Sequence, residues 1–151
     1  MMSESNNKNV LVLLSTGKLG SGIVDAFVQA KYNVFGTTRG THHPDLESKG
    51  VTPVPFLYGD KHSIERALDI AKPKVIVVIT SYQAVAKSLE AEVMHGKVIL
   101  DAAKEAKVPH VILTSSHLSE CDDDCPVQAY HMTSKKKIEG YMKELDLPCY
   151  M

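Results

Sequence analysis

The sequence is poor in cysteine, has no long hydrophobic run and carries almost no excess of charge. Its three cysteines, Cys121, Cys125 and Cys149, are too few and too unevenly placed for a disulfide framework. The longest apolar runs, such as residues 75–79, are far too short to span a bilayer, and the polar first nine residues lack the apolar core of a signal peptide. We therefore expect a cytoplasmic protein with no membrane partner.

The near balance of charge argues against partners that are recognised by a strongly basic surface. Seventeen basic side chains stand against eighteen acidic ones, and the densest cationic cluster is only residues 135–137, so we expect no nucleic-acid partner. Cys121 and Cys125 flank three aspartates, but zinc usually needs closer cysteine pairs and a second pair elsewhere. We therefore expect no metal.

The order of apolar segments along the chain predicts one α/β domain. The 151 residues, 44% hydrophobic and 23% charged, suit a single globular unit. After a polar tail over residues 1–8, short β-rich runs alternate with longer amphipathic stretches over residues 9–151, as in the doubly wound parallel sheet of the Rossmann fold. The expected strands are residues 9–14, 32–37, 54–58, 74–80 and 110–115. The expected helices are residues 20–30, a stretch opening at Ser63, residues 89–106, and a last helix marked by Ile138, Tyr141, Met142 and Leu145.

The third expected strand has a proline directly before it, Pro53, and a second one inside it, Pro55. Each proline removes a backbone donor, and two prolines two residues apart leave the same side of the strand without donors. The segment can therefore pair on one side only, which predicts an edge strand. In a doubly wound sheet of order 3-2-1-4-5, here with a partial sixth strand, the third strand is that edge.

The first strand runs into a glycine-containing turn and then a helix, which is where a dinucleotide fold binds phosphate. Backbone N–H groups at a helix N-terminus, approached closely over glycine, suit a pyrophosphate. The candidate contacts are Ser15, Thr16, Gly17, Lys18, Leu19 and Gly20. The alternative is a plain tight turn, because the dinucleotide glycine patterns would need glycine at Leu14 or at Ser15.

Arg39, at the end of the second strand, predicts which dinucleotide is preferred. An NAD enzyme usually offers an acid to the adenosine ribose at this point, about twenty residues after the loop, whereas this chain has Thr37-Thr38-Arg39. A carboxylate would repel a 2′-phosphate and a guanidinium binds it in bidentate fashion. The residues therefore favour NADP(H) over NAD(H), the alternative being that Arg39 is simply solvated.

Other polar residues follow the remaining strands at the carboxyl edge, where open α/β sheets bind ligands. Asp60 follows the third strand and could hydrogen-bond the adenine side of a dinucleotide, or could equally well cap the next helix. The further candidates at this edge are Thr80, Ser81 and Tyr82 after the fourth strand and Ser115 after the fifth.

With these elements placed, the chain resembles the NmrA-like family, atypical members of the short-chain dehydrogenase superfamily, over about residues 9–151. The matching stretches are TGKLGSG, TTR, YGD, ITSY, VILDAAKEAKVPHVILTSS and HMTSKKKIEGYMKELDLP. The resemblance implies that Gly17, Gly20 and Arg39 contact the cofactor phosphates, that Thr80 and Ser81 lie near the nicotinamide-side ribose, and that Lys135 is the family's lysine. Members of the family include NADP-binding redox sensors and transcriptional co-regulators, and reductases of quinones or isoflavonoid-like substrates.

Two departures from the superfamily bear on catalysis. Catalytic members carry Tyr-x-x-x-Lys, but four residues before Lys135 this chain has His131. Tyr130 is one position out of register, a rotation of about 100° on a helix, so it should not share a face with Lys135. His131 either substitutes as the acid or lies at the core margin, the interpretation we favour. The second departure is length: relatives continue into a substrate-binding region, so the sequence is expected to be a fragment or a shortened homologue.

Three functions remain open, in this order of preference. The first is a dinucleotide sensor or regulator whose NADP(H) occupancy is read by a protein partner. The second is an NAD(P)H-dependent reductase, with hydride from the nicotinamide and a proton from His131, Tyr130 or Ser116. The third is an interaction domain that has lost the cofactor.

Overall fold

The described residues form a parallel sheet of six strands, which lie side by side in the order third, second, first, fourth, fifth and sixth along the chain. The computed structural model describes residues 7–81, 86–115, 130–147 and 149–150, with the backbone course alone for 130–132 and 149–150. The strands are β1 (Asn9–Val12), β2 (Asn33–Thr38), β3 (Thr52–Pro55), β4 (Val75–Val78), β5 (His110–Leu113) and β6 (Cys149–Tyr150). The helices are α1 (Lys18–Gln29), α2 (Pro44–Glu47), α3 (Lys61–Ala71), α4 (Leu89–Glu105) and α5 (Tyr130–Glu144). The predicted doubly wound Rossmann fold and its strand order are confirmed.

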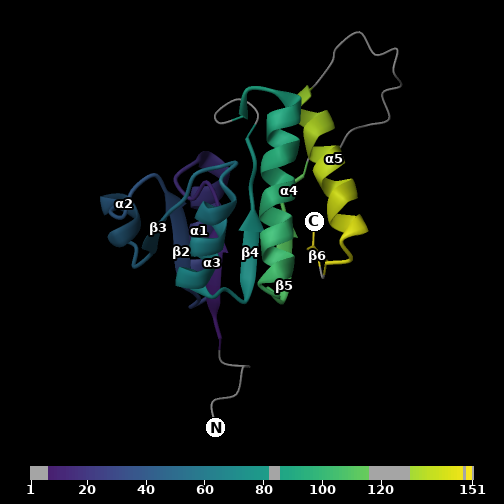
Figure 1. The fold of residues 1–151 in the computed structure, drawn as a ribbon. Coiled ribbons are helices and arrows are strands. Elements are labelled where there is room, and N and C mark those ends of the chain that lie inside the picture. The colour runs from purple at the N-terminus through teal and green to yellow at the C-terminus, as the bar shows by residue number, and fades with distance from the viewer. Residues whose placement is uncertain (1–6, 82–85, 116–129, 148, 151) are drawn as a thin grey trace.

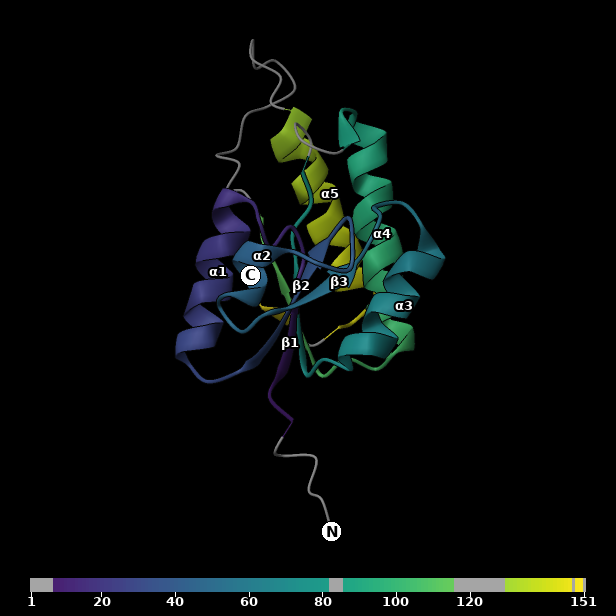
Figure 2. The same ribbon diagram turned by 90° about the vertical axis from the view of Figure 1, so that its left-hand side faces the viewer.

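Helices cover the sheet from both sides (Figures 1 and 2). Helix α1 lies on one face, and α3, α4 and α5 lie on the other, with α4 between its two neighbours. The central strands β1 and β4 are buried on both faces, which explains why their sequences are continuously apolar rather than alternating. Such strands can project polar groups only beyond their ends, and this directs any site to the edges of the sheet.

The two prolines of β3 lie at the open edge, as predicted. Pro53 pairs with Gly36 of β2 and Pro55 with Thr38. The Phe56 amide donates to the Thr38 carbonyl, so the alternate residues of β3 direct their N–H groups toward β2. The prolines therefore have their nitrogens on the unpaired side, where no donor is needed.

Three local predictions are wrong or incomplete. The third strand covers residues 52–55 rather than 54–58, because the chain leaves the sheet after Phe56. Helix α3 begins at Lys61 rather than at Ser63: Asp60 is its N-cap and accepts a hydrogen bond from the Ser63 amide at 3.2 Å. The short helix α2 was not predicted, although a proline followed by two acids in its first turn is a typical helix start.

A backbone contact brings α1 against the end of β1. Leu14 has a φ of 46°, the left-handed conformation that usually selects glycine, and this turns its carbonyl toward the helix. A Cβ on Gly20 would lie 1.9 Å from that carbonyl oxygen, so only glycine fits there. Gly22 lies two residues further along α1, and a Cβ added there would have no atom within 4 Å.

This contact predicts opposite effects for two matched substitutions in one helix. Gly20→Ala should lower the free energy of unfolding by roughly 1–3 kcal/mol, because backbone atoms must move to admit the methyl group. Gly22→Ala should raise it by about 0.5–1 kcal/mol, because alanine loses less conformational entropy in a helix. Urea unfolding followed by circular dichroism measures both. Equal effects of the two substitutions would contradict the close packing at Gly20.

Candidate functional site

A cavity of about 620 Å³ opens at the carboxyl ends of β1, β2 and β3. Its walls come from the segments that follow these three strands, so residues distant in sequence meet there. The lining residues are Leu14, Thr16, Thr37, Thr38, Arg39, Gly40, His42, His43, Phe56, Leu57 and Tyr58. This is the edge at which open α/β sheets bind ligands.

The loop between β1 and α1 presents unpaired backbone donors beside this cavity. Gly17 is the N-cap of α1 and offers no side chain to bond the first helical turn. The N–H groups of Lys18, Leu19 and Gly20 belong to that turn, where a helix provides no internal partner and carries partial positive charge. The loop can therefore accept an anion between the helix end and the cavity.

Ser15 differs from the other predicted loop residues. Its side chain is fully buried, and its hydroxyl donates to the Thr37 carbonyl at 2.9 Å. Gly36 makes room for it, since a Cβ there would lie 2.6 Å from the Ser15 Oγ. The structure thus places the Ser15 side chain between β1 and β2, whereas Thr16, Gly17, Lys18 and Leu19 are exposed.

The far end of the cavity carries Arg39. The arginine is exposed, and it follows Thr38, whose hydroxyl donates to the Gly40 carbonyl at 2.5 Å and so folds the segment back after β2. Two histidines that were not predicted, His42 and His43, line the same wall. None of the described residues that line the cavity is an aspartate or a glutamate. The chemistry of this wall suits an anion.

The third wall is apolar and is centred on Tyr58. The Tyr58 ring packs edge-to-face on Phe56, with centroids 4.8 Å apart, and its hydroxyl donates to the Ile79 carbonyl at 2.5 Å. Burial, and then the charge of Glu92, raise the pKa of Tyr58 far above its ordinary range, so the phenol stays protonated. Tyr58 therefore fixes the end of β3 to the end of β4 and gives the cavity a flat wall.

Asp60 does not line this cavity. Its carboxylate accepts the Ser63 amide as the N-cap of α3. Of the two interpretations offered by the sequence, the structure shows the cap.

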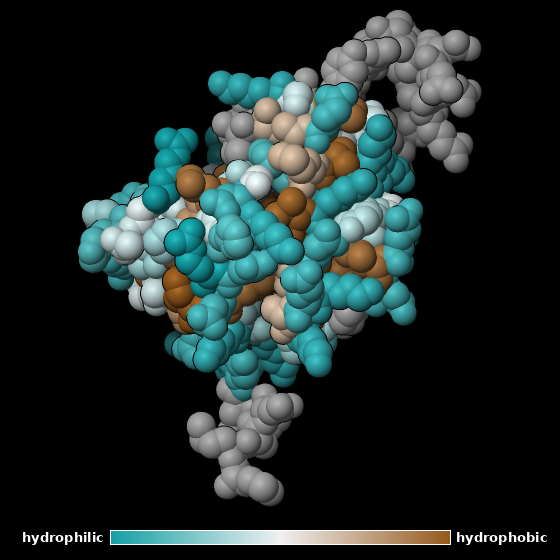
Figure 3. Space-filling view, viewed as in Figure 1, coloured by the Kyte–Doolittle hydropathy of each residue, from teal (hydrophilic) through white to brown (hydrophobic). Residues whose placement is uncertain are grey.

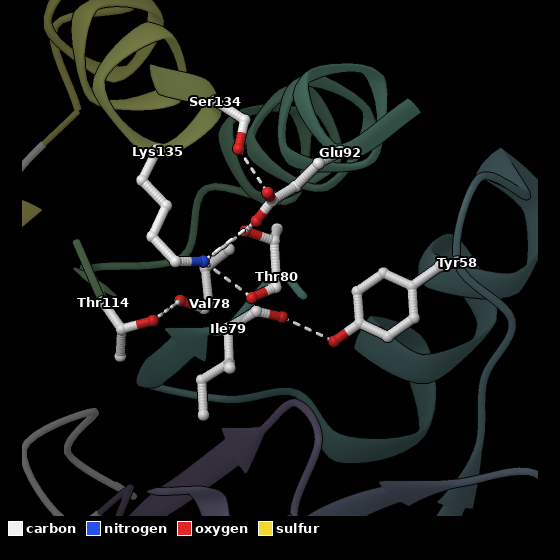
Figure 4. Close-up of polar contacts among 8 residues, drawn as sticks. All are labelled: Tyr58, Val78, Ile79, Thr80, Glu92, Thr114, Ser134 and Lys135. Carbon is white, nitrogen blue, oxygen red and sulfur yellow. Dashed lines mark hydrogen bonds and ion pairs between the residues drawn. The ribbon is translucent and has the colours of Figure 1, made fainter. Parts of the chain in front are cut away.

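A second cluster of polar side chains lies at the end of β4 (Figure 4). Glu92 of α4 is fully buried and accepts hydrogen bonds from Thr80 at 2.7 Å, from Lys135 at 2.9 Å and from Ser134. The Lys135 ammonium also donates to the Thr80 carbonyl at 2.8 Å and to the Thr80 hydroxyl at 3.3 Å. The predicted Thr80 and Lys135 are thus brought together, and α4 and α5 are both joined to the end of the strand.

These hydrogen bonds set the charge of the cluster. Burial alone would raise the pKa of Glu92, but the hydrogen bonds from Ser134, Lys135 and Thr80 and the charge of Lys135 outweigh it, and the pKa lies below its ordinary value. Glu92 is therefore an anion at neutral pH. His95, one turn further along α4, has its pKa lowered by burial, which the charge of Glu92 only partly offsets.

The remaining predicted residues are placed as follows. Ser115 is exposed and donates to Glu139 of α5 at 3.1 Å, and Ser81 follows Thr80 at the sheet edge. His131 lies in the first turn of α5, but its side chain is outside the described residues, as are Tyr82, Ser116, Cys121 and Cys125.

Besides His42 and His43, the sequence did not suggest three further polar residues of the site, Glu92, Ser134 and Tyr58. Glu92 carries a signal in retrospect, because it shares the buried stripe of α4 with His95, Gly96 and Ile99, and an acid in such a stripe needs partners. Its partners come from α5, 42 and 43 residues away, and no spacing rule reaches so far.

A larger cavity of about 860 Å³ lies at the opposite edge of the sheet. Residues that precede strands line it, among them Asn7, Lys74 and Pro109, together with the C-terminal ends of α3 and α4. Its mixed acidic and basic lining joins none of the predicted site residues. We assign the candidate site to the carboxyl edge, on topology rather than on size.

The surface and the helices add two observations. The face in Figure 3 is mostly hydrophilic, with apolar side chains in small groups. Among the described residues, no helix has the length and apolar character needed to cross a membrane.

Three solved structures with the same fold each have a sequence identity of less than one fifth to this chain. Triphenylmethane reductase of Citrobacter sp., crystallised with NADP(H), is 19% identical to this chain with a TM-score of 0.73. The match covers 93% of this chain and 47% of the reductase chain. The Escherichia coli NADPH-dependent quinone oxidoreductase QOR2, crystallised with NADPH, is 18% identical with a TM-score of 0.71, covering 91% and 46%. The Bordetella bronchiseptica enzyme WbmH, in complex with NAD+, is 18% identical with a TM-score of 0.71, covering 94% and 54%.

The chain spans about half the length of these proteins, and the likeness establishes the fold. No curated protein sequence matches the chain. The model of the NmrA-like family matches residues 6–151, which is nearly the whole sequence. The chain therefore belongs to the NmrA-like family.

Proposed function

We propose that the chain binds NADP(H) in preference to NAD(H) and acts as a dinucleotide sensor or regulator. The observation that carries the proposal is the composition of the cavity at the carboxyl edge. It joins the N-terminal loop of α1 to Arg39, and no described acid lines it. The bound dinucleotide would lie with its pyrophosphate at the loop and its adenosine 2′-phosphate at Arg39.

The residues present fit this group in charge and in shape. Pyrophosphate needs backbone donors that a ligand can approach closely, and the uncapped first turn of α1 supplies them. A 2′-phosphate needs a cation, which Arg39 supplies; no described acid lines the cavity, and the nearby Glu47 is paired with His42 at 3.2 Å. The apolar wall of Phe56, Leu57 and Tyr58 suits the adenine ring. Support also comes from the structures of the same fold that were crystallised with NADP(H), NADPH or NAD+.

The regulator role is supported by the residues that surround Lys135. In a catalytic short-chain dehydrogenase the lysine lowers the pKa of a tyrosine four residues before it, and here that position is His131. The Lys135 ammonium instead bonds Glu92 and Thr80. A dinucleotide bound beside it would be held without a phenol to supply a proton, and occupancy itself would be the signal that a protein partner reads.

A reductase is the second candidate function. The favouring observation is that two structures of the same fold are named as a reductase and an NADPH-dependent quinone oxidoreductase. A bound NADPH would supply hydride, and His131, Tyr130 or Ser116 would have to supply the proton.

Arg39→Glu should weaken NADPH binding by about a hundredfold and NADH binding by less than about threefold, because the substitution replaces attraction to the 2′-phosphate by repulsion. Arg66→Glu makes the same change of charge on the exposed surface of α3 and should leave both affinities unchanged. Calorimetric titration with each dinucleotide measures the four values. Equal losses for NADPH and NADH in Arg39→Glu would remove Arg39 from the site.

The sensor and the reductase are separated by turnover. We expect saturable NADPH binding in calorimetry and no oxidation of NADPH above the uncatalysed rate when a quinone is added in the same buffer. Absorbance at the nicotinamide band follows the reaction. Quinone-dependent oxidation by the wild type would make the protein a reductase. The absence of any dinucleotide binding would leave an interaction domain that has lost the cofactor.

A further inference from the structure

We propose that Glu92 is a positioning residue for the nicotinamide half of a bound dinucleotide. The proposal rests on the proposed function, because it concerns the other end of the same ligand. Glu92 acts through Lys135: it holds the ammonium against the end of β4, where one N–H makes only a long contact that a ligand can replace.

The topology places this cluster where the second half of the ligand must lie. The cavity that suits adenosine is formed by the segments after β1, β2 and β3. A dinucleotide bound across the switch point of the strand order then extends over the neighbouring strand β4. Thr80 lies two residues beyond the end of β4, and Lys135 reaches it from α5 (Figure 4).

The different exposure of the Lys135 and Glu92 side chains indicates that they have different roles. None of the Glu92 side chain is exposed, whereas 17% of the Lys135 side chain is. Glu92 therefore cannot touch a ligand, but the ammonium can. Its carboxylate is fixed from the inside by the hydroxyls of Thr80 and Ser134, so the ion pair has one defined geometry.

The hydrogen bonds of Lys135 leave one N–H that a ligand can take over. Two of its bonds are short, at 2.8 Å to the Thr80 carbonyl and 2.9 Å to Glu92, and the third is 3.3 Å to the Thr80 hydroxyl. The long contact is the weakest of the three, since hydrogen bonds weaken with distance. A ribose hydroxyl could replace it while the two short bonds keep the ammonium in place.

Without the charge of Glu92, this arrangement should loosen. Lysine loses much rotamer freedom when it is fixed, and the buried carboxylate offsets that loss. The neutral amide of Glu92→Gln keeps nearly the same shape. Its oxygen can accept the hydrogen bond of one of the two hydroxyls, Thr80 or Ser134, and its NH2 group can donate to the other. It cannot hold the ammonium by charge, so Lys135 would turn toward solvent.

The test compares two ligands that differ in the nicotinamide half. NADPH contains it, and adenosine 2′,5′-bisphosphate lacks it. Glu92→Gln should bind NADPH about tenfold more weakly than the wild type, the effect of one charged hydrogen bond, and should bind the bisphosphate with unchanged affinity. Glu90→Gln, in the same first turn of α4 but exposed, should change neither value.

A double-mutant cycle shows whether Glu92 acts through Lys135. Lys135→Met should weaken NADPH binding selectively, and adding Glu92→Gln to it should cause no further loss. Circular dichroism establishes that each variant is folded at the titration temperature. If Glu92→Gln does not fold, Glu92→Asp, which keeps the charge with a shorter reach, replaces it with the same expectation.

Four results would overturn the inference. Unchanged NADPH affinity in Glu92→Gln would show that the carboxylate positions nothing. An equal loss for both ligands would show a general structural effect. A wild type that binds the bisphosphate and not NADPH would place no nicotinamide half at this site, whereas a wild type that binds neither ligand would also overturn the proposed function.

Discussion

The contact between Gly20 and the Leu14 carbonyl is the constraint on which the candidate site depends. It brings the first turn of α1 to the end of β1, and the following residues Leu14 and Thr16 line the same cavity as Arg39. A side chain at position 20 would push the helix away and separate its first backbone donors from the strand ends. Leu14 adopts the left-handed backbone conformation that this turn requires, although it is not glycine. This conformation costs a residue with a Cβ about 1–2 kcal/mol.

A second set of contacts joins the other half of the molecule to the same edge. Helices α4 and α5 both bond the end of β4 through Glu92, Ser134 and Lys135 (Figure 4). Breaking a buried pair by removing one partner is costly, whereas the pair itself adds little net stability. The cluster is therefore better explained by the position it gives to Lys135 than by the stability it contributes. Tyr58 links it to the cavity after β1, β2 and β3, since its hydroxyl bonds Ile79 and its ring lies 5.4 Å from that of His95.

The sequence predicts the architecture well because the architecture depends on local signals. Apolar runs, helical periodicity and the two prolines of β3 are each contained within a few residues, and together they give the strand order. Element ends are less well predicted: the start of α3 depends on whether Asp60 or a later residue caps it, and both are plausible from sequence. The phosphate loop and Arg39 could be proposed because a strand, a turn and a helix follow one another in the chain.

The polar interior could not be predicted in the same way. Glu92 and Ser134 lie 42 residues apart and meet only because α4 packs on α5. The burial of Ser15 depends on Gly36 in the neighbouring strand, which a search for loop motifs does not consider. These contacts are products of the fold, and they decide which polar residues can reach a ligand and which serve the packing.

The proposed binding of NADP(H) at the carboxyl edge of the sheet is tested most directly by amide chemical shifts measured during an NADPH titration. We expect saturable shifts at Thr16, Gly17, Lys18 and Leu19 and at the Arg39 side chain. The amides of Lys74 and Lys107, at the larger cavity of the amino edge, should not move. Shifts confined to the amino edge, or no shifts at all, would contradict it.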